Sequence, residues 1–290
     1  MLSDSEHPQC HPFLKWVGGK TQLLDKIIPL IPDEIETYHE PFIGGGAVFF
    51  RLASQRPNLK AKLSDTNEDL INGYVIIQNQ VEDLIYSLDS ISQDYFSSND
   101  KEKFFYKTRE AYNTSKDKLE RTKYMIFLNK TCFNGLYRVN RSGEFNVPYG
   151  DNKKPKILDK ENLLAINKLL TKIDAEFQVL DYEQSLELCK KNDLCYLDPP
   201  YEPEKDQGFT NYTKNSFDQE NQKRLSTVIE RLTRKNTKVI LSNSESKLIH
   251  NLYPGNKYTI LKIPALRIIN SDSTNRKGTV ELVIMNFTHP

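Results

Sequence analysis

Apolar and polar positions along this 290-residue chain alternate in the order expected of strands separated by helices. Residues 21–31 carry apolar side chains at helical spacing, and prolines mark the end of that helix. Strand patterns are predicted at residues 37–42, 61–65, 176–181, 194–198, 237–243, 258–263 and 279–287. Strands that alternate with helices predict an α/β sheet that binds its ligands at the carboxyl ends of the strands.

Helical periodicity fills most of the intervals between these strands. Residues 67–88 predict one long amphipathic helix, and more helix follows through a charged stretch to residues 124–130. Periodicity is lost between residues 131 and 156, so this segment is predicted to be irregular. Further helices are predicted at residues 161–173, 182–191, 221–235 and 246–252.

The composition is that of a soluble globular protein, with 38% hydrophobic and 27% charged residues. The chain has no apolar run of about 18 residues and its first residues do not resemble a signal peptide, so no membrane segment is predicted and a cytoplasmic location is expected. The cysteines form no C-x-x-C pair and the histidines are scattered, so neither a metal site nor a disulfide framework is predicted.

Charge is unevenly distributed although the net charge is only +1. Residues 101–156 hold 14 Lys and Arg against 6 Asp and Glu, a local excess of +8 that leaves −7 for the rest. The first part of this region alternates in sign, as an exposed helix does. From residue 130 onward the basic residues are interleaved with aromatics, Asn and Gly, a mixture that is typical of nucleic-acid binding.

A glycine run lies where the first strand meets a helix, in the segment Glu40–Gly46 (EPFIGGG). Glycines here let the backbone approach a ligand closely while the amino end of the helix faces it. Asp65 ends the second strand, nineteen residues beyond Gly46, where dinucleotide-binding folds place an acid on ribose hydroxyls. The pattern is not G-x-G-x-x-G, which disfavours a nicotinamide cofactor, and a plain turn remains the alternative.

The segment KWVGGKT at residues 15–21 is close to a phosphate-binding loop but lacks its first glycine. Leu14 stands at that position and no strand precedes it, so an NTPase is not predicted. Trp16 is either a core anchor or a cover for a bound adenine or carboxylate.

The segment DPPY at residues 198–201 follows an apolar strand. Pro199 and Pro200 fix φ and remove two N–H donors, so backbone carbonyls and the Asp198 carboxylate are presented beneath Tyr201. Such acceptors suit a flat, uncharged group that offers an N–H. Asp-Pro is also a common turn and the following aromatic is often a core anchor, so the pattern alone leaves both interpretations open.

Taken together, KWVGGK, EPFIGGG and DPPY, with FNGLYRVNRSGEFNVPYG between the last two, resemble the Dam-type (alpha class) DNA adenine-N6 methyltransferases over nearly the whole chain. The resemblance implies S-adenosylmethionine as methyl donor and a Rossmann-like catalytic domain made of residues 1–67 and 157–290. It also implies a mostly helical DNA-recognition insert at residues 68–156. The chain departs from the family in its longer amino terminus and in the loop after Tyr201, whose contacts stay unassigned.

The resemblance assigns two sets of residues in the catalytic domain. Asp198, Pro199, Pro200 and Tyr201 form the target-base pocket, in which Asp198 and the Pro199 carbonyl accept N–H bonds from the adenine amine and Tyr201 stacks on a flipped base. The residues expected on the cofactor are Trp16, Lys20, Gly44, Gly45, Gly46, Asp65, Asp181 and Asp198. The transfer is a direct displacement that requires no metal.

In the insert, the resemblance implies that Arg138 reads a guanine through two hydrogen bonds and that Leu136 touches a thymine methyl group. The further residues expected on DNA are Lys15, Phe133, Asn134, Asn140 and Pro148.

We therefore expect an enzyme that methylates adenine N6 in duplex DNA, within GATC, by base flipping. A cognate restriction endonuclease is a candidate functional partner. The alternatives are an RNA or protein methyltransferase that uses the same pocket and a DNA-binding regulator without chemistry. The intact DPPY and glycine loop weigh against the regulator.

Overall fold

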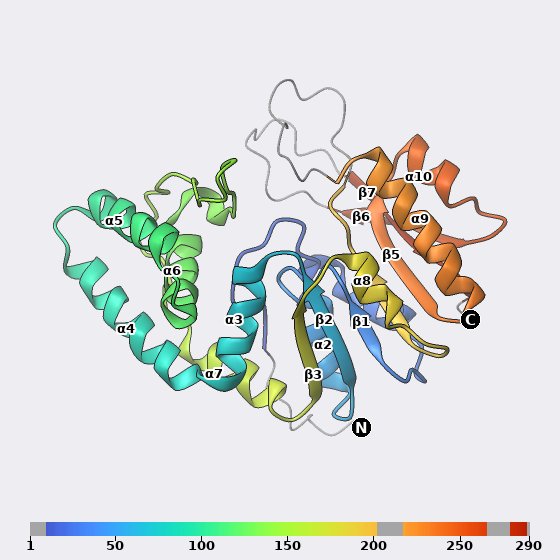
Figure 1. Cartoon of the computed structure of the whole chain (residues 1–290), viewed down its shortest axis with the longest axis horizontal. Coiled ribbons are helices and arrows are strands. Elements are labelled where there is room, and N and C mark those ends of the chain that lie inside the picture. Colours follow the sequence, from blue (N-terminus) through green and yellow to red (C-terminus); the bar gives the residue numbers. More distant parts are fainter. Residues whose placement is uncertain (1–9, 202–216, 266–278, 289–290) are drawn as a thin grey trace. The chain divides into compact units, whose positions relative to one another are not determined.

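The computed structural model describes residues 10–201, 217–265 and 279–288 of the chain (Figure 1). Its seven strands form one sheet with the order β3-β2-β1-β4-β5-β7-β6, which confirms the predicted α/β class. The strands are β1 (Tyr38–Glu40), β2 (Lys60–Asp65), β3 (Asp174–Val179), β4 (Leu194–Leu197), β5 (Lys238–Ser244), β6 (Thr259–Ala265) and β7 (Thr279–Met285).

Helices occupy most of the remaining described chain. The α-helices are α1 (Leu24–Ile27), α2 (Ala47–Gln55), α3 (Glu68–Asn79), α4 (Val81–Ser97), α5 (Lys101–Thr114), α6 (Lys118–Thr131), α7 (Lys160–Leu170), α8 (Tyr182–Glu187), α9 (Gln219–Arg234) and α10 (Lys247–Leu252). Short 3-10 helices are η1 (Thr21–Leu23), η2 (Ile28–Leu30) and η3 (Phe133–Gly135). Within the described residues, no helix is both long enough and apolar enough to span a membrane.

The chain divides into two compact units. Unit 1 is made of residues 1–19, 44–58 and 67–177, and it contains helices α2 to α7. Unit 2 is made of residues 20–43, 59–66 and 178–290, and it contains helices α1 and α8 to α10 and all strands except β3. Strand β3 begins in unit 1 and ends in unit 2.

The direction of the strands creates a switch point in the sheet. β1 pairs in parallel with β2 on one side and with β4 on the other, and β4 pairs in parallel with β5. After β1 the chain first adds β2 and β3 on one side of β1, and then adds β4 and β5 on its other side. Ligands are expected where this order reverses, at the carboxyl ends of β1 and β4. Glu40 ends β1 at this edge, and Asp198 directly follows β4.

Antiparallel pairing completes the sheet. β7 lies between β5 and β6 and runs against both. Its residue Glu281 stands opposite Ser244 of β5 and Ile263 of β6.

The core of unit 2 lies between the sheet and helices α8, α9 and α10, which Figure 1 shows on one face of the sheet. All of β4 is buried, as expected of a parallel strand that is covered on both faces. Apolar residues of α9 recur at helical spacing and pack on β4, β5 and β7. The buried cluster contains Tyr182, Leu186, Cys189, Cys195, Leu197, Leu225, Val228, Ile229, Leu232, Val239, Leu241, Ile249, Tyr253, Tyr258, Leu282 and Ile284.

In unit 1, α6 packs against α3, α4 and α5. Its residue Arg121 binds Asp69 of α3 through Nε at 2.7 Å and Nη2 at 2.6 Å, and Tyr112 of α5 donates to the same carboxylate. A bidentate pair of this kind fixes the orientation of the helices it joins as well as their distance.

Several predicted elements are divided or end at other residues in the structure; the helix predicted at 182–191, for example, ends at Glu187. The single helix expected at 67–88 breaks at Gln80, whose φ and ψ of −142° and 37° end α3 before α4 begins. The helix expected at 21–31 is divided into η1, α1 and η2. The strand expected at 176–181 ends at Val179, because Asp181 turns its side chain to cap α8.

Candidate active site

The DPPY segment places Asp198 at the carboxyl edge of β4, as predicted. The Asp198 side chain is 18% exposed, and its Oδ2 lies 2.7 Å from the ammonium of Lys20, which is 5% exposed. A lysine this deeply buried is rare unless it is paired. The pair therefore belongs to a built site and not to a solvated surface.

Lys20 has two further neighbours in unit 2. Its Nζ lies 3.6 Å from Glu281 Oε1 and 5.0 Å from the centroid of the Tyr201 ring. Glu281 was not among the predicted site residues. The acid stands in an otherwise apolar strand, TVELVIM, and this is the signal that points to it in the sequence.

The two carboxylates share one cation in a largely desolvated place. Burial raises the pKa of Asp198, and the neighbouring Lys20 opposes that rise. Burial also raises the pKa of Glu281, and again Lys20 opposes it. Glu281 Oε1 accepts no hydrogen bond from any described residue. One carboxylate oxygen of the site thus has no described hydrogen-bond donor, although Tyr201 and Ser242 also hydrogen-bond to the Glu281 side chain.

Tyr201 and the turn around it are held by neighbouring side chains. The Tyr201 hydroxyl donates to Asp198 Oδ1 at 3.4 Å, and burial raises the pKa of Tyr201, so its ring stays uncharged. Gln222 of α9 donates to the Pro200 carbonyl at 3.3 Å and accepts from Asn243 of β5 at 3.1 Å. The prolines and this pair of amides fix the turn in advance.

The glycines at 44–46 form part of unit 1, where Gly46 is the N-cap of α2. Gly44 and Gly46 have φ values of 48° and 70°, in the left-handed region that favours glycine. The Tyr74 hydroxyl donates to the Gly44 carbonyl at 2.8 Å, and a Cβ at Gly46 would lie 2.7 Å from that hydroxyl. A Cβ at Gly44 would lie 2.8 Å from Trp16, and Gly45 also packs against Trp16. The loop therefore admits only glycine at 44 and 46.

Trp16 is partly exposed and stacks on Tyr137, with ring centroids 5.4 Å apart. It packs against Gly44 and Gly45 of the glycine loop, and part of its ring stays exposed.

Two acids predicted to lie near a cofactor are placed in unit 2. Asp65 ends β2 and is partly exposed, as predicted. Asp181 is the N-cap of α8, accepts a hydrogen bond from the Glu183 amide at 3.0 Å and pairs with Arg224 at 3.3 Å. The Asp181 carboxylate is thus already bound to the first turn of α8 and to Arg224.

Residues 132–150 of unit 1, which we call the reading loop, form a closed irregular segment, as the loss of periodicity predicted. Isolated bridges join Cys132 to Tyr149 and Val139 to Phe145. Arg138 is exposed, and its Nε and Nη2 donate to the side-chain and backbone oxygens of Asn146 at 2.7 and 3.2 Å. The guanidinium is therefore held in one orientation at the surface.

The other residues predicted to touch DNA have different surroundings within unit 1. Phe133 is 45% exposed and Asn134 has a φ of 56°. The side chain of Asn140 accepts from the amides of Ser142 and Glu144, so it builds the turn at residues 140–144. Lys15 and Pro148 are exposed, and Leu136 is partly buried.

Asn129 of α6 ties Lys15 to the reading loop. Its Oδ1 accepts from the Lys15 amide at 2.8 Å, and its Nδ2 donates to the carbonyls of Lys15 and Gly135, both at 2.9 Å. The fit is tight, because a Cβ at Gly135 would lie 2.5 Å from the Lys15 side chain. Lys15 and the loop thus form one rigid arrangement.

Comparison with known proteins assigns these features to a family. The family model described as D12 class N6 adenine-specific DNA methyltransferase matches residues 16–269. The chain belongs to this class. It is 44% identical to the type II methyltransferase M.MjaIII of Methanocaldococcus jannaschii, with 95% of this chain and 99% of that protein covered.

Two further relatives agree with this assignment. The chain is 38% identical to the type II methyltransferase M1.LlaDCHI of Lactococcus lactis subsp. cremoris, over 95% of each protein. It is 33% identical to the DNA adenine methylase of Escherichia coli strain K12, over 94% of each. The predicted family, enzyme class and fold are therefore confirmed, and the protein is an adenine-specific DNA methyltransferase that acts on duplex DNA.

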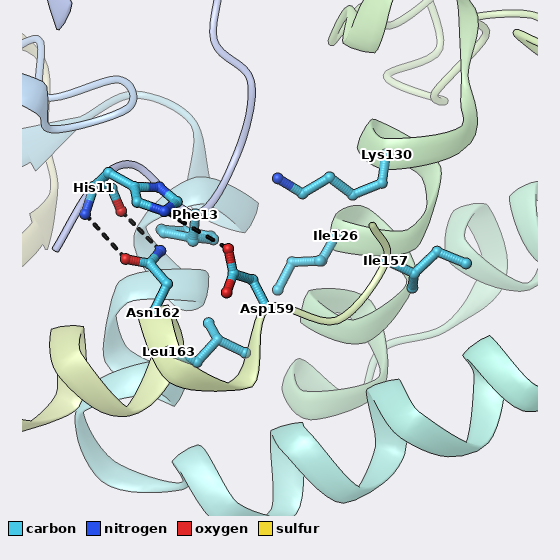
Figure 2. A pocket seen from close by; sticks show the side chains of 8 residues that line it. All are labelled: His11, Phe13, Ile126, Lys130, Ile157, Asp159, Asn162 and Leu163. Carbon is cyan, nitrogen blue, oxygen red and sulfur yellow. Dashed lines mark hydrogen bonds and ion pairs between the residues drawn. The ribbon is translucent and has the colours of Figure 1, made fainter. Parts of the chain in front are cut away.

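The methyltransferase has a further pocket in unit 1, beside the segment that leads to Lys15 (Figure 2). Asn162 of α7 accepts from the His11 amide at 3.0 Å and donates to the His11 carbonyl at 3.0 Å. Figure 2 shows His11 turned toward Asp159 and Lys130 extending into the space between them and α6. The pocket has room for about one water. It is therefore too small for a nucleotide, and the two hydrogen bonds of Asn162 hold the chain at His11 beside it.

Proposed function

We propose that this methyltransferase transfers the methyl group of S-adenosylmethionine to N6 of adenine within GATC, after the adenine has rotated out of the duplex. The observation that carries the proposal is the buried Lys20–Asp198 pair beside Tyr201 at the carboxyl end of β4. Its place at the switch point of the sheet is where α/β folds bind nucleotide ligands.

The donor set of the site fits the cofactor. The methionine part of S-adenosylmethionine carries a carboxylate and an ammonium, and unit 2 offers the buried Lys20 for the first and the Asp198 carboxylate for the second. Asp65, at the end of β2, is suited to accept hydrogen bonds from ribose hydroxyls. For the glycine backbone at 44–46 and the partly exposed Trp16, both in unit 1, and for Asp181, a contact with the cofactor stays a prediction of the sequence.

The bound cofactor supplies an electrophilic methyl group on a sulfonium. The protein must then make the adenine amine a better nucleophile, because its lone pair is conjugated with the ring. Asp198 and the Pro199 carbonyl accept hydrogen bonds from the N–H groups of the amine and so direct the lone pair of N6 toward the methyl group. Pro199, Pro200 and Gln222 hold these acceptors in place before the base arrives, so no reorganisation is required during the transfer.

Tyr201 supports the rotation of the base out of the helix. N6 of a paired adenine cannot reach a methyl donor at the end of a strand, so the base must leave the stack. The uncharged Tyr201 ring beside Asp198 offers a stacking surface that offsets part of the cost of unstacking. Lys20 next to this ring neutralises Asp198 until the amine arrives.

Sequence specificity is assigned to the reading loop and Lys15. Arg138 is presented in a fixed orientation by Asn146, and a guanidinium fork matches the O6 and N7 acceptors of guanine. Leu136 is assigned to a thymine methyl group, and Lys15 to an outer guanine. Phe133 and Pro148 are assigned as wedges at the target site, with Asn134 and Asn140 near the DNA.

The test measures transfer of tritium from labelled S-adenosylmethionine to a duplex with one GATC, to a duplex without it, to RNA and to a protein mixture. We expect label only on the GATC duplex and only at adenine N6, located by sequencing of modified bases. Label on RNA or protein would support the alternative substrates, and no label on any acceptor would support a silent DNA-binding regulator. A cognate restriction endonuclease stays a prediction of the sequence.

A further inference from the structure

The ammonium of Lys20 lies between two carboxylates that come from different strands. Asp198 Oδ2 is 2.7 Å from Nζ, and Glu281 Oε1 is 3.6 Å from it. The first distance is that of a charge-assisted hydrogen bond, and the second is an ion pair without a hydrogen bond. A displacement of about 1 Å would reverse the two relations.

The shorter contact conflicts with the role assigned to Asp198. An oxygen that accepts from Lys20 at 2.7 Å is partly occupied, and its negative charge is balanced. It is then a poorer acceptor for the neutral amine of adenine than a carboxylate without that partner. Lys20 must therefore loosen its hold on Asp198 when the amine enters, and a buried ammonium cannot be left unpaired.

We propose that Glu281 is a positioning residue that takes the Lys20 ammonium from Asp198 when the target amine binds. This inference rests on the proposed function. Glu281 is suited to the task because it is 7% exposed, faces Lys20 from β7, and has an Oε1 that accepts no hydrogen bond from any described residue. The exchange forms one hydrogen bond and breaks another, and no proton changes place.

The groups around Glu281 leave its Oε1 able to accept a hydrogen bond from a cation that moves closer. The groups that act on it are Lys20, Asp198, and Tyr201 and Ser242, which both hydrogen-bond to its side chain; Glu281 acts in turn on the buried Tyr196 of β4. Lys20 is the only cation among those groups. Burial raises the pKa of Glu281, and Asp198 adds to the rise, so the glutamate gains from any closer approach of Lys20.

Glu281→Gln tests the exchange, because glutamine keeps the size of the side chain but offers Lys20 no negative charge. We expect the single-turnover rate of methyl transfer to fall roughly 10-fold to 100-fold, while the dissociation constants for S-adenosylmethionine and DNA stay within about 2-fold. Glu245→Gln is the matched control, since Glu245 is an exposed glutamate of unit 2 that pairs with Lys262. The control should match the wild type.

The pH dependence of the rate separates positioning from a merely structural role. Two coupled carboxylates must both be ionised in the wild type, so the logarithm of the rate should fall in acid with a slope approaching about two. With Glu281 replaced by Gln only Asp198 remains, and the slope should be about one. An unchanged slope with a lower rate at every pH would overturn the proposal.

Thermal unfolding without cofactor or DNA gives a readout that does not depend on activity. The pKa of Glu281 is raised above its ordinary value of 4.5, so the folded protein binds this proton more tightly than the unfolded chain does. Stability should therefore fall as pH rises from the ordinary value through the raised one. Glu281→Gln should make that fall shallower, and an equal fall in variant and wild type would show that Glu281 is not the buried acid that the exchange requires.

The outcomes distinguish this inference from the proposed function. If Asp198→Ala loses methyl transfer while Glu281→Gln keeps the wild-type rate and slope, the proposed function stands and the exchange is wrong. If Asp198→Ala itself transfers methyl at the wild-type rate, the proposed function fails first.

Discussion

The charge cluster of unit 2, to which catalysis is assigned in the proposed function, and the reading loop of unit 1 hold their charged residues in opposite ways. In unit 2, Lys20 and Glu281 are buried, Asp198 is mostly buried, and both carboxylates pair with the Lys20 ammonium. In the reading loop, Arg138 points to solvent and only its orientation is fixed, through Asn146. Chemistry at an amine benefits from acceptors in a place without water, whereas reading a base requires a charge that stays accessible.

Substitutions in the two regions are therefore expected to change different measured quantities. Losses in unit 2 should appear in the rate of transfer or in the affinity for cofactor, whatever the DNA sequence. Losses in the reading loop should appear as a change of preference among DNA sequences.

The largest effect is expected from Asp198→Ala, which removes the carboxylate that is proposed to accept hydrogen bonds from the amine. Loss of a preorganised group of this kind costs about 10²-fold or more in rate. Single-turnover transfer to a GATC duplex measures it, and calorimetry should show that S-adenosylmethionine still binds, more weakly. Asp174→Ala, at an exposed acid in β3, is the control. Near-normal turnover by the Asp198 variant would disprove the assignment.

Asp65→Ala should weaken cofactor binding without altering sequence preference. A charge-assisted hydrogen bond contributes about 1.5 to 3 kcal/mol, so the dissociation constant for S-adenosylmethionine should rise roughly 10-fold to 150-fold. Calorimetry measures the affinity, and rates on duplexes altered outside the adenine measure the preference. Unchanged affinity would mean that the ribose is held by other residues.

Arg138→Ala should relax the preference for one outer guanine of GATC. A bidentate contact to guanine contributes about 1 to 3 kcal/mol of discrimination, or roughly 5-fold to 150-fold. The measurement compares rates on GATC and on duplexes altered at each outer position, at one fixed salt concentration, because backbone binding depends strongly on salt.

Arg141→Ala serves as the control for Arg138, since Arg141 is an exposed arginine of the same loop. An equal loss of rate on every duplex would make Arg138 a phosphate contact, and another residue would have to read the guanine.

The smallest effect is expected from Asn146→Ala, which leaves Arg138 in place but removes one of its two anchors. A hydrogen bond of this kind contributes about 0.5 to 1.5 kcal/mol, so discrimination at the same guanine should fall only a few-fold. The same set of duplexes measures it, with the exposed Asn152→Ala as control. If discrimination changes at a different base, or does not change at all, then the hydrogen bond from Arg138 to Asn146 does not contribute to the recognition of this guanine.

The sequence predicts the parts of the site that depend on local chemistry. DPPY predicts the end of a strand, because proline has no N–H to donate to the hydrogen-bond ladder of a sheet. The glycine run predicts a turn, because residues other than glycine rarely adopt the left-handed backbone conformation. Asp65 follows from its place at the end of a predicted strand. The structure confirms all three positions.

What the sequence does not predict depends on pairing between distant segments. Glu281 joins the site only because β7 inserts beside β5, and no local pattern specifies that neighbour. The hydrogen bond between Asn129 and Lys15 joins residues 114 positions apart. From the sequence alone, Asn129 could equally be a polar residue on the exposed face of a helix. The break at Gln80 occurs without a glycine or proline, so periodicity continues across it.

The position of β7 has a consequence for how the enzyme is made. β7 is the last of the seven strands along the chain, yet it lies inside the sheet between β5 and β6. During synthesis β5 therefore keeps an open edge, with unpaired backbone groups, until residues 279–285 have emerged. Because Glu281 arrives on this strand, we expect a nascent chain to complete its sheet and its buried charge cluster in the same event.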